Sequence, residues 1–152
     1  SIGIEIVYEG EKSKKTYTNS QISSLIVLIN HLKEKHQIKQ SNILGHSDIA
    51  PMRKIDPGIF FPWEELFKQK IGIWPKILKE KKDLIDLPDK DFILFLKNLE
   101  IIGFDKIIFE ANFNKNKYII NAFHRHYLID HLNKKPSYFS YKVSQEIIKL
   151  TD

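Results

Sequence analysis

The 152-residue sequence contains no cysteine, which excludes disulfide bonds, cysteine-ligated zinc and thiolate chemistry. Arginine is scarce as well: Arg53 and Arg125 are the only two among 24 basic residues, so flexible lysines carry almost all of the positive charge. No apolar run approaches the roughly 20 residues that span a bilayer, so we expect no transmembrane segment. The length is typical of about one domain, and a hydrophobic content of 42% is ordinary for a globular protein.

The net charge of +5 is spread along the chain. Neither end carries a basic arm, and no stripe of lysines or arginines is visible. Nucleic-acid binding usually leaves such an electrostatic footprint, so we predict no nucleic-acid partner. A mildly basic surface would suit an anionic polymer equally well.

The first residues alternate in character, as expected of a strand. Ile2, Ile4 and Ile6 would point to one face, and Gly3, Glu5 and Val7 to the other. A domain seldom begins within a strand, so we expect an upstream segment that completes the fold. Apolar residues at helical spacing then predict a helix over residues 20–37, and a second short strand is expected at 42–45.

Pro75 marks a predicted domain boundary in the chain. We predict one domain over residues 1–75, a charged linker over 76–90 and a helical module over 91–152. Apolar spacing predicts three short helices in the module, over residues 91–100, 117–131 and 140–150. A bundle of about sixty residues is near the lower size limit for independent stability.

A loop follows the second predicted strand and carries the candidate chemistry. His46 and Asp56 lie ten residues apart in it, and imidazole nitrogen and carboxylate oxygen are both good zinc donors. A catalytic zinc usually takes three protein ligands, so the third would come from elsewhere, most simply from the upstream strand. A histidine and an aspartate at this spacing can also form a turn hydrogen bond, in which case Lys54 and Glu5 are ordinary surface side chains.

The order of residues in the loop resembles a family signature. Residues 45–58 read G-H-S-D-I-A-P-M-R-K-I-D-P-G, and residues 61–63 read F-P-W. This stretch resembles the AmpD-like N-acetylmuramoyl-L-alanine amidases of the type-2 amidase family, with Met52 in place of a small residue. The resemblance covers about residues 1–75. It implies an α/β fold in which a mixed β-sheet is flanked by helices, incomplete at the N-terminus and followed by the small three-helix module.

The resemblance implies a zinc-dependent hydrolase that cleaves the amide bond between N-acetylmuramic acid and L-alanine in peptidoglycan or muropeptides. His46 and Asp56 match two of the family's metal ligands, and the remaining ligand is a histidine upstream of residue 1. Glu5 matches the acidic residue that accepts the proton of the attacking water and transfers it to the leaving amine. Lys54 matches the cation beside the developing oxyanion. Zinc would polarise the carbonyl group and lower the pKa of water.

Other polar residues of the loop have expected roles near that site. Arg53 could reach a carboxylate of the substrate, and Ser47 is a second candidate for substrate binding. Asp48 is expected either to brace the loop or to orient His46.

The C-terminal part resembles the helical peptidoglycan-binding module often appended to these amidases. The resemblance rests on residues 120–127 and 143–148, with His124 where the module has glutamine. Whether this part binds glycan or packs on the amidase stays open. Its histidines lack the i, i+4 spacing of a helical metal pair, so we expect His124, His126 and His131 to be structural.

A non-catalytic peptidoglycan-recognition protein is the alternative, because the amidase fold also occurs in binders that have lost zinc ligands. The presence of His46, Lys54 and Asp56 together favours the enzyme. The implied substrate places the protein in the bacterial cell envelope, in the periplasm or outside the cell, although the sequence shows no targeting segment.

Overall fold

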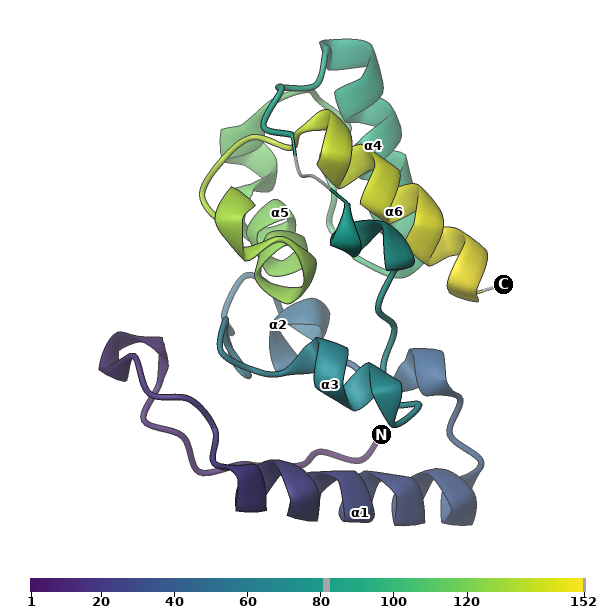
Figure 1. Ribbon diagram of the computed structural model, residues 1–152. Coiled ribbons are helices and arrows are strands. Elements are labelled where there is room, and N and C mark those ends of the chain that lie inside the picture. The colour runs from purple at the N-terminus through teal and green to yellow at the C-terminus, as the bar shows by residue number, and fades with distance from the viewer. Residues whose placement is uncertain (81–82, 152) are drawn as a thin grey trace.

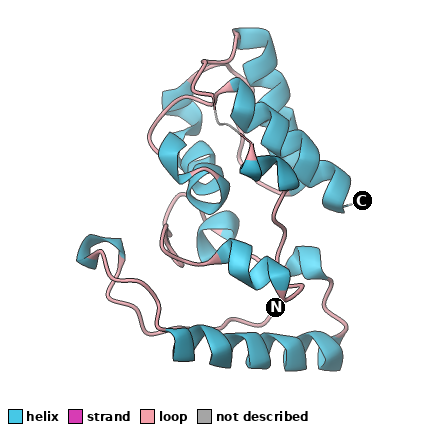
Figure 2. Ribbon diagram, in the orientation of Figure 1, coloured by secondary structure: helices cyan, strands magenta, loops and turns pink. Residues whose placement is uncertain are grey.

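The computed structural model describes residues 1–80 and 83–151. Within these ranges the named elements are all helical, and they form a lower and an upper group in the view of Figures 1 and 2. The lower group comprises α1 (Asn19–His36), α2 (His46–Ile49) and α3 (Trp63–Lys68). The upper group comprises α4 (Asp89–Ile102), α5 (Phe113–Tyr127) and α6 (Tyr138–Thr151). Short 3-10 turns lie at Glu11–Ser13, Gln40–Asn42, Lys76–Lys79 and Ile129–His131.

The predicted mixed β-sheet flanked by helices was wrong. The N-terminal segment alternates only in part: Ile4 and Ile6 pack against the hydrophobic cluster beside α1 and Glu5 is exposed, but Ile2 is exposed as well. In the described ranges, however, the β contact is an isolated bridge between Asp86 and Ser137. Alternation determines which side chains are buried, whereas a sheet also requires a neighbouring strand that binds the backbone N–H and C=O groups.

The second predicted strand, over residues 42–45, is also not a strand in the structure. Its first residue ends the 3-10 turn Gln40–Asn42, and Ile43 continues in extended backbone and packs against the cluster beside α1. His46 therefore does not follow a strand, as predicted, but is the first residue of the short helix α2.

A capping box fixes the start of α1 in the lower group. Thr18 Oγ1 accepts a hydrogen bond from Gln21 N at 3.2 Å, and Gln21 Oε1 accepts one from Thr18 N at 2.9 Å. The inner face of α1 packs against α3 and the residues after it. This smaller hydrophobic cluster contains Tyr17, Ile22, Leu25, Ile29, Leu66 and Ile71.

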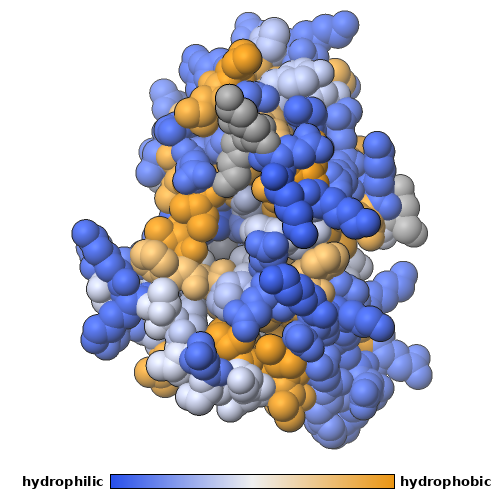
Figure 3. Space-filling view, in the orientation of Figure 1, coloured by the Kyte–Doolittle hydropathy of each residue, from blue (hydrophilic) through white to orange (hydrophobic). Residues whose placement is uncertain are grey.

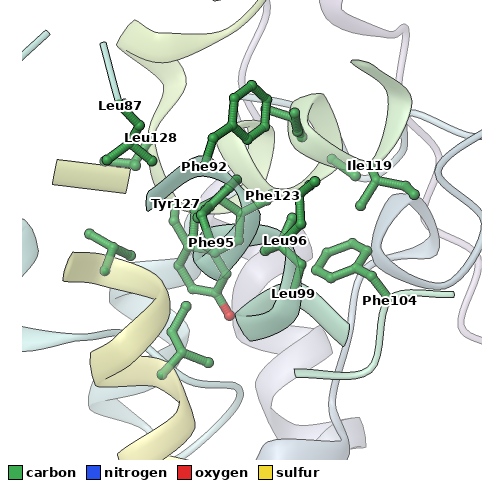
Figure 4. Close-up of a cluster of buried hydrophobic side chains, with 14 of the residues drawn as sticks. Leu87, Phe92, Phe95, Leu96, Leu99, Phe104, Ile119, Phe123, Tyr127 and Leu128 are labelled. Atoms are coloured by element: carbon green, nitrogen blue, oxygen red, sulfur yellow. The ribbon is translucent and has the colours of Figure 1, made fainter. Parts of the chain in front are cut away.

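The larger hydrophobic cluster lies among α4, α5 and α6 (Figure 4). Phe95 of α4 and Phe123 of α5 meet edge to face within it, with ring centroids 5.4 Å apart. Hydrophilic side chains cover most of the face shown in Figure 3. Across the described ranges, no helix has both the length and the apolar character needed to span a membrane.

The segment after α3 joins the lower group to the upper one. Trp74 packs against the larger cluster. Lys76 N and Ile77 N then donate hydrogen bonds to the carboxylate of Glu146 in α6, at 2.7 and 3.1 Å. The predicted boundaries at residues 75 and 90 stay a prediction, and two residues of the predicted linker, 81 and 82, lie outside the described residues together with Asp152.

A buried histidine lies in the core of the upper group. His124 Nε2 of α5 lies 3.0 Å from Ser140 Oγ of α6, and both residues are fully buried. The pKa of His124 is lowered to about 3. Burial is the main cause, and the positive charge that His131 can carry is the second. The folded imidazole is therefore neutral at pH 7.

We expect the free energy of unfolding to decrease as the pH falls from about 6.5 towards 3, because the unfolded chain binds a proton that folded His124 excludes. This group alone contributes at most about 1.4 kcal/mol per pH unit. In His124→Gln the amide can still bind Ser140 but does not titrate, so the decrease should be shallower. Denaturant unfolding of both proteins across this pH range is the measurement, and parallel curves would show that another group is responsible.

Candidate active site

The loop between Ile43 and Trp63 brings the two predicted metal ligands together. Ser47 N donates a hydrogen bond to the carbonyl oxygen of Asp56 at 2.8 Å, which ties the start of α2 to the far end of the loop. His46 Nδ1 then lies 3.0 Å from Asp56 Oδ2. The two side chains are 37% and 52% exposed, so an ion can reach them from solution.

The donor atoms and their spacing fit a zinc ion. Two donors bound to a tetrahedral zinc at about 2.0–2.1 Å lie about 3.4 Å apart. His46 Nδ1 and Asp56 Oδ2, at 3.0 Å, are close to that separation. The same two atoms are also at hydrogen-bond distance, as the turn interpretation predicts. Among the residues that the structure describes, no group of three His, Cys, Asp or Glu side chains could hold a metal.

Asp48 braces the loop, which is the first of the two roles expected for it. Its Oδ2 accepts a hydrogen bond from Gly45 N at 2.8 Å, directly before His46. The same oxygen accepts a second hydrogen bond from His126 Nδ1 of α5, also at 2.8 Å. The side chains of Asp48 and His126 are 8% and 3% exposed. The His126 ring stacks on Trp63 at a centroid distance of 4.0 Å, so the contact is fixed by packing as well as by polar bonds.

Gly45 lies in a space that admits no larger residue. A Cβ atom added there would lie 2.8 Å from Pro57 Cδ and 3.3 Å from the Trp63 ring. We therefore expect Gly45→Ala to reduce the free energy of unfolding by about 1–3 kcal/mol, as overpacking usually does. Gly3→Ala is the matched control, because its Cβ would meet nothing within 4 Å. Thermal unfolding of both variants is the measurement, and equal midpoints would contradict the packing argument.

Glu11 holds the C-terminal end of the same loop. Its Oε1 accepts hydrogen bonds from Ile59 N and from Arg125 Nε of α5, both at 3.0 Å. Both carboxylate and guanidinium are largely buried. Gly58 has a φ of +86° and would place a Cβ 3.1 Å from this carboxylate, so a glycine is required there.

Tyr17 provides a further anchor beside the predicted ligand Asp56. Its hydroxyl donates to the carbonyl oxygen of Pro57 at 2.8 Å. Burial raises the pKa of Tyr17 to about 12, and the neighbouring Tyr8, Asp56 and Glu11 contribute smaller electrostatic effects in the same direction. The phenol is therefore a protonated donor throughout the ordinary pH range.

The other predicted site residues occupy different environments. Lys54 is half-buried, and its backbone N–H donates to Ala50 O at 3.0 Å. Arg53 is exposed and Ser47 is buried. Glu5 lies on the exposed side of the N-terminal segment, and the described part of the chain shows no hydrogen bond or ion pair that joins it to the His46–Asp56 pair. In the part of the chain that the structure describes, a contact thus joins the two metal-ligand candidates to each other, whereas none joins Glu5 to them.

A cavity of about 330 Å³ lies at the junction of the two groups of helices, apart from the loop. Trp74 and Tyr127 line it, with Glu64 and Lys79 among its polar residues. None of its lining residues belongs to the loop from Gly45 to Gly58.

Comparison with known proteins relates the loop to one class of enzyme. Residues 1–59 match the family model described as Amidase_2, N-acetylmuramoyl-L-alanine amidase. The N-acetylmuramoyl-L-alanine amidase AmiD of Escherichia coli is 43% identical over 81 residues, which make up 49% of this chain and 29% of AmiD. The 1,6-anhydro-N-acetylmuramyl-L-alanine amidase AmpD of Haemophilus influenzae is 43% identical over 65 residues, 42% of this chain and 34% of that protein.

Solved structures show the same relationship over more of the chain. E. coli AmiD, in complex with the substrate anhydro-N-acetylmuramic acid-L-Ala-D-gamma-Glu-L-Lys, superposes with a TM-score of 0.77 at 26% identity. The match covers 89% of this chain and 53% of the AmiD chain. AmpDh3 of Pseudomonas aeruginosa shares the fold, with a TM-score of 0.68 at 21% identity over 90% of this chain and 55% of its own.

These matches relate the N-terminal part of the chain to the peptidoglycan amidases. The resemblance of the loop is confirmed: residues 1–59 match the model of the type-2 N-acetylmuramoyl-L-alanine amidases, and this part of the chain is AmpD-like. The chain spans about a third of the curated relatives it matches and about half of the solved structures.

Proposed function

We propose that this protein hydrolyses the amide bond between N-acetylmuramic acid and L-alanine in peptidoglycan or muropeptides, and that it uses zinc. The observation that carries the proposal is the 3.0 Å approach of His46 Nδ1 to Asp56 Oδ2, within a segment that matches the amidase family. A muropeptide as substrate is supported by the complex of the related AmiD with such a molecule.

His46 and Asp56 would hold the zinc ion, and a histidine from outside residues 1–152 would be the third protein ligand. Zinc, when bound, supplies a Lewis acid that polarises the amide carbonyl and acidifies water. The exposure of the pair leaves one side open for water and substrate. The buried braces on Asp48 and Glu11 hold the two ends of the loop, so the donors stay close together before a metal arrives.

The remaining residues of the proposed site move protons and stabilise charge. Glu5 accepts a proton from the attacking water and transfers it to the nitrogen of L-alanine, which leaves as a free amine. The Lys54 ammonium stabilises the negative charge that develops on the carbonyl oxygen. Arg53 and Ser47 belong to the substrate-binding surface, with the exposed Arg53 as the partner for a substrate carboxylate.

The same substrate class supports a location for the protein. We place it in the bacterial cell envelope, in the periplasm or outside the cell, where peptidoglycan and its fragments are found.

The test is incubation of the zinc-supplemented protein with an N-acetylmuramoyl-L-alanyl peptide, followed by mass spectrometry. We expect release of a peptide with a free L-alanine amine, and a chelator should stop the release. Binding of the muropeptide without cleavage by zinc-loaded protein would support the non-catalytic recognition alternative instead. If the protein neither bound nor cleaved the muropeptide, both the amidase function and the recognition alternative would be contradicted.

A further inference from the structure

We propose that α5 is a positioning element of the His46–Asp56 site, with His126 and Arg125 as positioning residues for the two ends of the loop. The inference rests on the proposed function, because it concerns the donors of the zinc site. It gives the helical part of the chain a role in the amidase site itself, whether or not that part also binds glycan.

His126 controls the end of the loop that carries His46. The carboxylate oxygen Asp48 Oδ2 is the acceptor in this contact, and His126 Nδ1–H is the donor, at 2.8 Å. That oxygen also binds Gly45 N, the amide directly before His46. α2 packs against α5 (Figure 1), and Trp63 and Tyr127 each stack on the His126 ring at 4.0 Å. The imidazole is thus rigidly held, and it fixes the carboxylate that caps the start of α2.

Arg125 controls the end of the loop that carries Asp56. Its Nε binds Glu11 Oε1, and the same oxygen binds Ile59 N, three residues after Asp56. Arg125 and His126 are neighbours on α5, yet they act through different carboxylates on opposite ends of one loop. The distance between the two zinc donors therefore depends on a helix more than 60 residues further along the chain.

Two substitutions at His126 separate its hydrogen bond from its packing. His126→Phe keeps an aromatic ring between Trp63 and Tyr127 but removes the donor to Asp48. His126→Asn loses the ring, but its side-chain N–H can occupy the place of Nδ1. His124→Phe is the matched control, because it makes the same change in the same helix, at a buried histidine that binds Ser140 instead of the loop.

Amide hydrogen exchange and zinc titration, both of the protein with its proposed third ligand present, are the two readouts. In His126→Phe we expect exchange at Gly45 and Ser47 to accelerate at least tenfold, and zinc affinity to fall by about tenfold. His126→Asn should restore most of the protection. Arg125→Gln, a second variant that keeps the His126 contact, should accelerate exchange at Ile59 and leave Gly45 protected.

The outcomes separate this inference from the proposed function. Unchanged exchange at Gly45 and Ser47 in His126→Phe, or equal acceleration in His124→Phe, would overturn the positioning role. A wild-type chain that binds no zinc but shows the expected exchange pattern would contradict the zinc site and leave the positioning role standing. Zinc binding that is equal in all variants, with unchanged exchange, would overturn the positioning role alone.

Discussion

His46→Ala and Asp56→Ala are each expected to abolish zinc binding and to reduce amide hydrolysis by more than about a hundredfold. Each substitution removes one of the two proposed metal donors, and this loss should exceed the 10–100-fold effects typical of residues that only support a metal ligand. The two side chains are half-exposed and make one contact with each other at 3.0 Å, so unfolding should change by less than about 1 kcal/mol. Metal analysis, muropeptide cleavage and thermal unfolding measure the three effects.

Two exposed residues outside the site provide controls for this pair. His36 lies at the end of α1 and Asp105 follows α4, and both are exposed. His36→Ala and Asp105→Ala should keep the metal content and activity of the parent protein. If His46→Ala or Asp56→Ala also retained zinc, the pair would be a turn hydrogen bond and no more.

Lys54→Ala is expected to lower the turnover rate by about 10²–10³-fold while the zinc content stays unchanged. The reason is the proposed role of Lys54: loss of one group that stabilises an oxyanion has an effect of this size in other hydrolases. The backbone of Lys54 is held by its bond to Ala50 O at 3.0 Å, so the loop should keep its path without the side chain. Cleavage rates at saturating muropeptide measure the effect.

Lys97→Ala on the exposed side of α4 is the matched control for loss of a lysine. Its turnover should equal that of the parent. Loss of zinc from Lys54→Ala would show that this residue supports the loop rather than the reaction.

Several features could be predicted from the sequence because they depend on neighbours in the chain. The pairing of His46 and Asp56 follows from one short loop whose ends are tied by a backbone hydrogen bond. The burial of Ile4 and Ile6 and the exposure of Glu5 follow from simple alternation. In these cases the local sequence indicates which side chains lie together or are exposed, although contacts with α5 also hold the two ends of the loop.

The features that could not be predicted depend on distant partners. A sheet was expected from alternation alone, but alternation says nothing about the neighbouring strand that a sheet requires. The Asp48–His126 contact joins residues 78 positions apart, and the Glu11–Arg125 contact joins residues 114 positions apart. A single sequence holds no periodic signal for such pairs. The nearest sequence signals for the first contact are Asp48, which was expected to brace the loop or orient His46, and His126, whose spacing does not suit a helical metal pair.

The Asp48–His126 contact also limits how the two parts of such a chain can be exchanged by recombination. A hybrid that received α4, α5 and α6 from a donor without a histidine at this place would leave a buried carboxylate with one partner fewer. Loss of a hydrogen-bond partner by a buried group of this kind costs about 1–3 kcal/mol, or more when the group is charged. Hybrids should therefore fold well only when Asp48 and His126 are inherited together, and the same constraint should make the two positions vary jointly among descendants of one ancestor.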